Sequence, residues 1–367
     1  MTPAAVSGQN NASSRAPLVT PRFSSWMGFS RATIVFAIVG FICPAAIACT
    51  NFMATDGALV LFGDSEDGGL GHDLVEDPES AAVFFVPRAP GEHGRMHLGW
   101  VLEGKYRSFQ AGMNERGLAY GLTSVPDSPQ DSHPERPYSF SDTPYFDRLL
   151  ALAETVDEVI ALTMEYSAER LWFQAMFVDA KGDAVVIGPG PDGDFAFTRK
   201  DATASVLTAV STINLADPPR HPWIDAVKRS KDATSVLQEA VDEDALGPSA
   251  FARALDAVHR ESLALGGSYT MYSTTYDLTH RVAHVYFMSQ FDEAVEIDLA
   301  EELGKGSDIL LMTDLFSDDL QERAFGQFDA EERVGRVTLA VEIAAVIALL
   351  GAAAIGIGLL AFSLLGQ

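Results

Sequence analysis

Short runs in which apolar and polar residues alternate fill the middle of the chain, and this is the pattern of half-buried β-strands. Two such runs follow Cys49 and are joined by the turn pair Asp56-Gly57, which predicts a β-hairpin. The expected strands cover residues 50–54, 58–62, 81–86, 96–101, 117–124, 171–179, 184–187, 204–210, 269–277, 282–288 and 294–298.

Apolar residues recur every three to four positions in other segments, which predicts amphipathic helices. The expected helices cover residues 144–153, 156–166, 223–231, 233–242 and 249–263. Because the strands come in consecutive pairs with the helices gathered between them, the order favours antiparallel sheets covered by helices over a parallel sheet. We therefore expect an α+β fold.

An uncharged apolar run, residues 32–48, follows Arg31 and ends in Ala46-Ile47-Ala48. Signal peptidase recognises this small-x-small pattern, and the run is short for a membrane-spanning helix, which needs about 20 apolar residues. We therefore expect residues 1–48 to be a leader and signal peptide that is removed, so that the mature chain begins at Cys49. A start at Met27 gives a leader of more usual length, and the sequence leaves both starts open.

A second apolar segment lies at the C-terminal end, where no charged residue follows Glu342. Its length and its Ala, Ile, Leu and Gly content predict a transmembrane helix within residues 337–365. Residues 316–336 are rich in charges and predict a stalk, which leaves 49–315 as the folded domain. With an export signal ahead of it, this domain is expected outside the cytoplasmic membrane, in the periplasm or at the cell surface.

Acidic residues dominate the charge of the chain, with 51 Asp and Glu against 25 Lys and Arg and a formal charge of −26. Nucleic acid is therefore not an expected partner, because its binding depends on Lys and Arg that neutralise phosphates. The chain has no Walker-type glycine loop, CxxC pair or HExxH helix, so no metal or organic cofactor is expected. The pattern gives no indication of the oligomeric state.

Cys49 is the single cysteine of the expected mature chain, because Cys43 lies in the segment to be removed. As the first residue it combines a thiol with an α-amine, whose reference pKa of about 7.7 to 8.0 leaves an appreciable fraction unprotonated near neutral pH. Attack of the thiolate on an amide carbonyl gives an acyl-enzyme, and the amine can pass a proton to the leaving nitrogen. The sequence thus predicts a cysteine nucleophile that carries its own base.

Four stretches carry a resemblance to a known family, and they follow the family's order: ACTNF with DGALVLFGDSEDGG at the start of the expected mature chain, then GMNERGLAYGL at 112–122, VDAKGDAVVI at 178–187 and YSTTYDLTHRVAHVYF at 272–287. Together they resemble the N-terminal nucleophile hydrolases of linear amides, of the penicillin V acylase and choloylglycine hydrolase type, with their acyl-CoA:6-aminopenicillanate acyltransferase relatives. The resemblance covers residues 49–300. It implies an αββα sandwich, with two antiparallel sheets between helical layers, and a small N-acyl amide as substrate.

The resemblance also implies roles for four residues. Cys49 matches the nucleophile, and Asp67 in GDSED matches the aspartate that holds the nucleophile's amino group. Asn114 in MNERG matches an asparagine of the oxyanion hole, and Asn214 in STINL loosely matches a second asparagine. The ordinary interpretations are a solvated loop acid for Asp67 and a turn residue before Gly117 for Asn114.

The chain departs from the family pattern after Gly63, where many relatives carry an arginine and this chain carries Asp64. An acid at this place raises the pKa of a neighbouring thiol, whereas an arginine lowers it. Some acyltransferase-like relatives have asparagine there, so the change need not remove activity, but it makes bile-salt specificity a less favoured expectation.

Histidine offers a different general base for the cysteine, and the candidates are His72, His93, His97 and His280. Their spacing selects none of them. His93 and His97 stand among glycines, which predicts a solvated loop pair in place of metal ligands on a helix. Arg281 is expected to be a turn cation.

The sequence therefore supports one hypothesis and leaves two alternatives open. The hypothesis is an exported, C-terminally anchored cysteine amidohydrolase that cleaves the C–N bond of a linear N-acyl amide through an acyl-enzyme on Cys49. The first alternative is an acyltransferase of the same fold, in which an amine replaces water. The second is a non-enzymatic envelope binding protein, in which Cys49 carries lipid or stays inside an uncleaved signal anchor.

Overall fold

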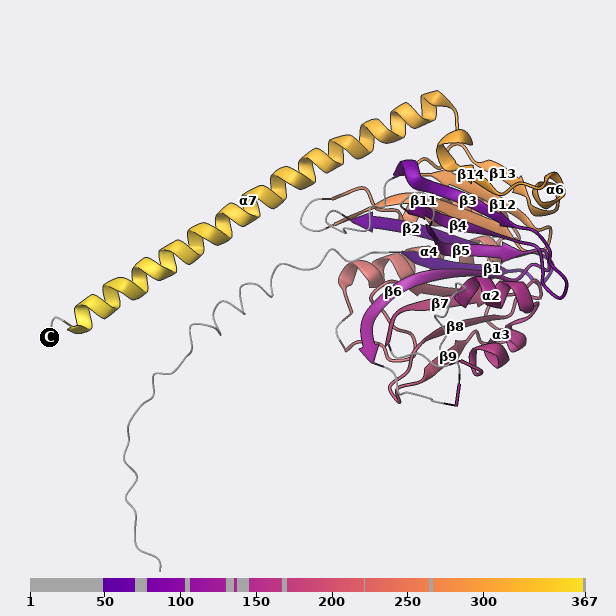
Figure 1. The fold of residues 1–367 in the computed structure, drawn as a ribbon, viewed down its shortest axis with the longest axis horizontal. Coiled ribbons are helices and arrows are strands. Elements are labelled where there is room, and N and C mark those ends of the chain that lie inside the picture. Colours follow the sequence, from indigo (N-terminus) through magenta and orange to yellow (C-terminus); the bar gives the residue numbers. More distant parts are fainter. Residues whose placement is uncertain are drawn as a thin grey trace, which may run out of the picture. The chain divides into compact units, whose positions relative to one another are not determined.

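Two stacked antiparallel sheets with helices on their outer faces make up the fold (Figure 1). The computed structural model describes residues 49–69, 78–102, 106–129, 135–136, 145–166, 170–220, 222–263 and 267–365. The expected leader, residues 1–48, lies outside the described residues.

The first sheet, sheet A, has the strand order β10-β1-β2-β11-β12-β13. Its strands are β1 (Thr50–Thr55), β2 (Val60–Gly69), β10 (Val206–Val210), β11 (Ser268–Asp277), β12 (Val282–Phe287) and β13 (Val295–Asp298). Sheet B has the order β14-β3-β4-β5-β6-β7-β8-β9. Its strands are β3 (Ala81–Val86), β4 (Arg95–Leu102), β5 (Tyr106–Asn114), β6 (Ala119–Pro129), β7 (Arg170–Val178), β8 (Ala184–Pro189), β9 (Phe195–Arg199) and β14 (Ile309–Leu311).

Three apolar cores separate four layers. The largest lies between the two sheets, the second packs sheet B against helices α2 (Tyr145–Leu152) and α3 (Val156–Thr163), and the third packs sheet A against α4 (Ile224–Asp242) and α5 (Pro248–Val258). The order helix, sheet, sheet, helix confirms the predicted αββα sandwich.

Strand β1 shows how this layering fixes the direction of each side chain. Successive residues of a strand point to opposite faces, so Met53 enters the core between the sheets while Phe52 and Ala54 pack toward α4 and α5. By the same alternation Cys49 and Asn51 lie on the Met53 side. The thiol therefore belongs to the interior between the two sheets.

Some elements differ from the prediction, and pairing explains the largest difference. Strand β2 continues through the glycine-rich residues 63–69, where the sequence suggested a loop, because β11 pairs with it as far as Gly69. The two helices expected at 223–231 and 233–242 form the single helix α4, since no Gly or Pro interrupts them. Strands β5, β9 and β14 and the short helix α6 (Leu299–Lys305) were not predicted. Arg281 is an exposed turn residue with φ of 63°, as expected.

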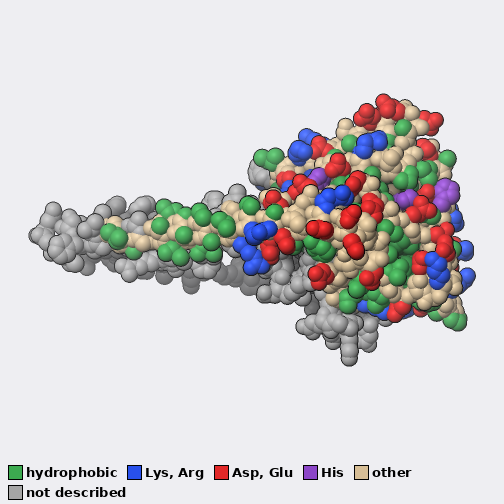
Figure 2. Space-filling model, turned by 90° about the horizontal axis from the view of Figure 1, so that it is seen from above, with side chains coloured by type: hydrophobic (Ala, Val, Ile, Leu, Met, Phe, Trp, Pro, Cys, Tyr) green, Lys and Arg blue, Asp and Glu red, His purple; other side chains and the backbone are tan. Residues whose placement is uncertain are grey.

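Helix α7 (Asp318–Leu365) begins against the sandwich instead of as a free stalk. Leu320 and Ala324 are buried in the core between the sheets, and the ring of Phe328 lies 5.2 Å from that of Tyr269. The helix is long and apolar enough to cross a membrane, with a mean hydropathy of 2.3 in its most apolar window and none of that window buried. Figure 2 shows exposed hydrophobic side chains along the helix, and Val337 is one of its exposed apolar residues.

Candidate active site

Cys49 lies at the entry to β1, inside the sandwich, with 3% of its surface exposed. Its carbonyl oxygen accepts a hydrogen bond of 2.9 Å from the backbone N–H of Ser211, at the end of β10. Its thiol donates to Oε2 of Glu66 at 3.3 Å. Because Thr50 pairs with Ser65, Glu66 stands directly across from Cys49 on the neighbouring strand.

Acidic surroundings keep the thiol protonated. Burial raises the pKa of Cys49 well above its ordinary value, and the nearby carboxylates of Glu66 and Asp67 raise it further, whereas the backbone N–H of Asp67 lowers it. A protonated thiol is a poor nucleophile. Chemistry at this sulfur therefore needs a base.

Asp67 is fully buried on β2, so the interpretation as a solvated loop acid is wrong. Its Oδ1 accepts from the hydroxyl of Thr270 at 2.5 Å, while its Oδ2 has no hydrogen-bond partner among the described residues. Burial raises the pKa of Asp67, against the opposing effect of the Arg229 and Arg260 guanidinium groups. The structure thus brings Cys49 and Asp67 together.

Arg229 ties the entry of β1 to the helical layer. It is buried on α4, donates to the hydroxyl of Thr50, and pairs with Asp225 at 3.1 Å. A cation on this side of sheet A partly offsets the negative charge of Asp67. The residue beside the nucleophile is therefore held by a charged contact that the sequence did not reveal.

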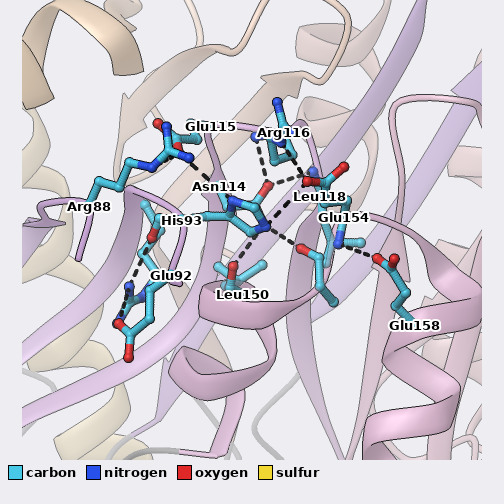
Figure 3. A network of polar contacts seen from close by, with 12 residues as sticks. Arg88, Glu92, His93, Asn114, Glu115, Arg116, Leu118, Leu150, Glu154 and Glu158 are labelled. Carbon is cyan, nitrogen blue, oxygen red and sulfur yellow. Dashed lines mark hydrogen bonds and ion pairs between the residues drawn. The ribbon is translucent and has the colours of Figure 1, made fainter. Parts of the chain in front are cut away.

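Asn114 closes the turn between β5 and β6 (Figure 3). Its Nδ2 donates to the carbonyl oxygens of Leu150 and Ala153, each at 2.8 Å. Its Oδ1 accepts from the backbone N–H groups of Arg116 and Leu118, each at 3.0 Å. These four bonds leave no amide hydrogen for a substrate oxygen, so the contacts favour the turn interpretation over the oxyanion hole.

Asn214 lies in the loop after β10, three residues beyond Ser211. Its Nδ2 donates to the carbonyl oxygen of Pro189 at 2.7 Å, and its Oδ1 accepts from the backbone of Ala216 at 3.1 Å. One amide hydrogen takes part in neither of these two bonds, and the residue is 9% exposed. Its role in catalysis stays a prediction.

Three further polar residues lie near Cys49. The sequence analysis did not mention Asn51 or Thr123, and it treated Asp64 only as a departure from the family pattern. Asn51, Asp64 and Thr123 are at most 1% exposed, and their side-chain polar atoms have no hydrogen-bond partner among the described residues. Asn51 and Asp64 pair directly across β1 and β2. A Cβ added to Gly121 of β6 would come within 2.8 Å of both side chains, so the opposite sheet approaches them closely.

Thr123 follows Gly121 by two residues on β6 and therefore points into the same interior. Its neighbour Ser124 accepts from the N–H of Thr212 at 2.7 Å and donates its own N–H to the hydroxyl of Ser211 at 3.1 Å. Since Ser211 also binds the carbonyl of Cys49, these bonds place Thr123 across the interior from the nucleophile.

The raised pKa of Asp64 can be tested by measuring how the free energy of unfolding depends on pH. Burial and the charge of Asp67 raise the pKa of Asp64 well above its ordinary value. Folding therefore takes up a proton above the unfolded pKa of about 3.9, and the parent loses about 1.4 kcal/mol for each pH unit through that window. Asn does not titrate, so Asp64→Asn should gain stability relative to the parent as the pH rises.

Guanidinium unfolding of both proteins at about pH 4.5 and pH 7.5 measures this difference. The expected result is a larger advantage of the variant at the higher pH. A constant or shrinking advantage would show that Asp64 is ionised and satisfied in the folded protein.

Of the histidines proposed as an alternative base, His97 is engaged elsewhere, and His72 lies outside the described residues. His97 is fully buried on β4 and not part of a solvated pair. Its Nε2 lies 2.9 Å from Oδ1 of Asp147 and its Nδ1 lies 3.2 Å from the hydroxyl of Tyr120. Arg95 holds the same aspartate through two bonds. Both ring nitrogens are thus engaged in an ion-pair network under α2, on the outer face of sheet B.

Comparison with known proteins identifies relatives by structure. No family model matches the chain, and no curated protein matches it. A variant of the conjugated bile acid hydrolase from Clostridium perfringens superposes with a TM-score of 0.55 at 15% identity, covering 72% of this chain and 96% of that one. The penicillin V acylase from Agrobacterium tumefaciens gives 0.52 at 17%, covering 71% and 90%. The chain has the fold of these hydrolases.

This fold agrees with the sequence resemblance, which named the same two types of enzyme. At such identities the likeness establishes the architecture. The activity must be argued from the residues that surround Cys49.

Proposed function

We propose that the protein is an exported, membrane-anchored cysteine amidohydrolase that cleaves the C–N bond of a linear N-acyl amide. The observation that carries the proposal is the position of Cys49. It directly follows a segment with the pattern of a cleaved signal, and its thiol is buried between the sheets. The hydrolase fold supports the same chemistry, since two enzymes that share it are a bile acid hydrolase and a penicillin acylase.

Removal of residues 1–48 gives Cys49 a free α-amine, and this amine is the base that the protonated thiol lacks. The amine accepts the thiol proton, the sulfur attacks the substrate carbonyl carbon, and a tetrahedral oxyanion forms. The C–N bond then breaks as the ammonium returns its proton to the leaving nitrogen. Water activated by the same amine attacks the thioester, releases the carboxylic acid and restores the thiol.

Asp67 is suited to hold this amine. Its Oδ1 is fixed by the hydroxyls of Thr270 and Ser65, and its Oδ2 is available to accept a hydrogen bond. An ammonium formed next to this carboxylate is stabilised, which favours proton transfer from the sulfur. Asp67 thus acts as a positioning residue for the base.

In this proposal Asn51 and Thr123 form the oxyanion hole in place of Asn114, whose amide hydrogens are engaged by Leu150 and Ala153. Asn51 Nδ2 and the hydroxyl of Thr123 are buried donors that have no hydrogen-bond partner among the described residues, and they lie on the two sheets that face each other. A fixed donor that meets an oxyanion away from water typically contributes about 3 to 4 kcal/mol to the transition state. The pair supplies one donor from each sheet.

Thr123→Val is expected to lower kcat by about a hundredfold with little change in KM, because the hydroxyl bonds the oxyanion and not the ground-state carbonyl. Steady-state kinetics on the best amide substrate measures this effect. Thr163→Val, which makes the same change at a buried threonine of α3, is the matched control and should leave kcat unchanged. Equal kinetics for both variants would remove Thr123 from the mechanism.

The activity itself is tested with the processed protein, which begins at Cys49 and keeps its C-terminal helix, in detergent and with a panel of N-acyl amides of increasing chain length. Cys49-dependent release of the free acid and the free amine is the expected result. Including a competing amine identifies an acyltransferase by the transferred acyl group. A chain that turns over no member of the panel, or does so equally without the thiol, is not the proposed enzyme.

A further inference from the structure

Asp64 is the most unusual carboxyl group of the site, since no described residue forms a hydrogen bond with it. It is fully buried, and neither carboxyl oxygen has a hydrogen-bond partner among the described residues. Buried carboxyl groups without a partner are rare in folded proteins, because removing them from water is costly. A bound ligand that forms hydrogen bonds with the Asp64 carboxyl group would remove this cost.

The neighbours of Asp64 are polar groups in the same condition. Asn51 lies directly opposite on β1, with neither amide atom partnered among the described residues. On the other side Thr274 of β11 pairs with Asp64, and Tyr272, two residues away on the same face, has a buried hydroxyl without a hydrogen-bond partner among the described residues. Polar groups of the two strands that flank β2, without partners in the described part of the chain, thus surround one carboxyl group.

Aromatic rings line the same region. Tyr272 and Tyr276 flank Thr274 on the face that carries Asp64. Trp100 of the opposite sheet packs on Tyr272 with ring centroids 5.5 Å apart, and Phe62 stacks on Tyr276 at 5.7 Å. Carboxylates and aromatic faces are the groups that proteins use to bind ammonium ions.

The acidic residues of β2 also favour a positively charged ligand at this place. Asp64, Glu66 and Asp67 lie close together on β2, and the guanidinium groups of Arg229 and Arg260 act on Asp67. Asp64 is influenced by burial and by Asp67, with no cation among the groups that act on it. A positive ligand is therefore the charge complement of this part of the interior, and the net charge of −26 attracts such ligands from solution.

We propose that Asp64, with Asn51 and Tyr272, forms a subsite that selects amide substrates carrying an ammonium group. Asn51 and Cys49 lie two residues apart on one strand face, which corresponds to about 7 Å, so the ammonium lies at about that distance from the scissile carbonyl. This inference rests on the proposed amidohydrolase function. It adds to that function the chemical class of the substrate.

Matched substrate pairs test the subsite. The first pair is 6-aminohexanoyl 4-nitroanilide and heptanoyl 4-nitroanilide, which exchange an ammonium for a methyl group at the required distance. The second pair places the same exchange in the leaving amine, with N-acetyl-1,6-diaminohexane and N-acetylheptylamine. The parent is expected to favour the ammonium member of one pair by at least about tenfold in kcat/KM, as a charged hydrogen bond allows.

Asp64→Asn keeps the shape of the side chain and removes its charge, so it should bring this preference to within about twofold while the neutral member is still hydrolysed. Asp192→Asn makes the same change at an exposed position and should keep the preference of the parent. If the parent hydrolyses both members of each pair equally, or favours the neutral one, and does so through Cys49, the amidohydrolase function stands and the subsite is refuted.

A binding measurement separates the subsite from catalysis. If no pair is turned over, or if turnover survives in Cys49→Ala, the proposed function fails and calorimetry with hexylammonium chloride decides on the subsite alone. Binding to the parent about tenfold tighter than to Asp64→Asn supports it. Equal affinity for the two proteins, or no saturable binding to the parent, overturns it.

Discussion

Cys49→Ala is expected to abolish amide hydrolysis, with kcat/KM reduced by at least about 10⁴-fold, because the variant has no atom that can form the acyl-enzyme. Cys49→Ser is expected to keep a small residual activity, since a hydroxyl can attack but is harder to deprotonate by the α-amine. No other free cysteine exists among the described residues to replace the thiol. Hydrolysis of the best amide by the purified proteins from which residues 1–48 have been removed measures both effects.

The control for these variants is their stability. The Cys49 thiol makes one hydrogen bond, to Glu66, so neither substitution should change the unfolding midpoint much. An alanine variant that folds like the parent and still hydrolyses the amide at the parental rate would show that the nucleophile lies elsewhere.

Asn114→Ala is expected to lower the free energy of unfolding by about 3 kcal/mol or more, because it leaves buried backbone groups without partners. The carbonyl oxygens of Leu150 and Ala153 and the N–H of Leu118 would each lose a hydrogen bond (Figure 3). Chemical denaturation measures the loss, and the kcat of the folded variant should stay within about threefold of the parent.

This experiment separates two roles of the same side chain. A structural role predicts lost stability with retained kcat. A stable variant whose kcat falls by about 10² to 10³ would assign Asn114 to the oxyanion hole and displace Thr123 from it.

The architecture could be predicted from the sequence because its elements carry clear periodicity and turn signals. The hairpin turn at Asp56-Gly57 was expected, and strands β1, β11 and β12 were expected with nearly their observed bounds. The glycine-rich part of β2 could not be assigned, because its strand conformation comes from pairing with β11, which is distant in sequence. The charged residues at the start of α7 did not indicate that Leu320 and Ala324 pack into the core of the sandwich.

The candidate site was only partly accessible from the sequence. Cys49 stood out through its place at a processing signal, and Asp67 through a family motif. Asn51 could have been found from strand alternation, since it follows Cys49 by two residues on the same face. Thr123 could not have been found in this way, because its position across the interior from the nucleophile depends on how the two sheets stack. No pattern along the chain encodes how the two sheets approach each other.

The central claim is that processing turns Cys49 into a nucleophile with its own base. Intact mass and N-terminal sequencing of the protein taken from its native envelope, before and after brief reaction with a slowly hydrolysed amide, test this most directly. The account predicts a chain that begins at Cys49 with a free amine and gains the mass of one acyl group, which hydroxylamine removes and which Cys49→Ala never acquires. A mature chain that begins at another residue, or an acyl group on any other side chain, would contradict it.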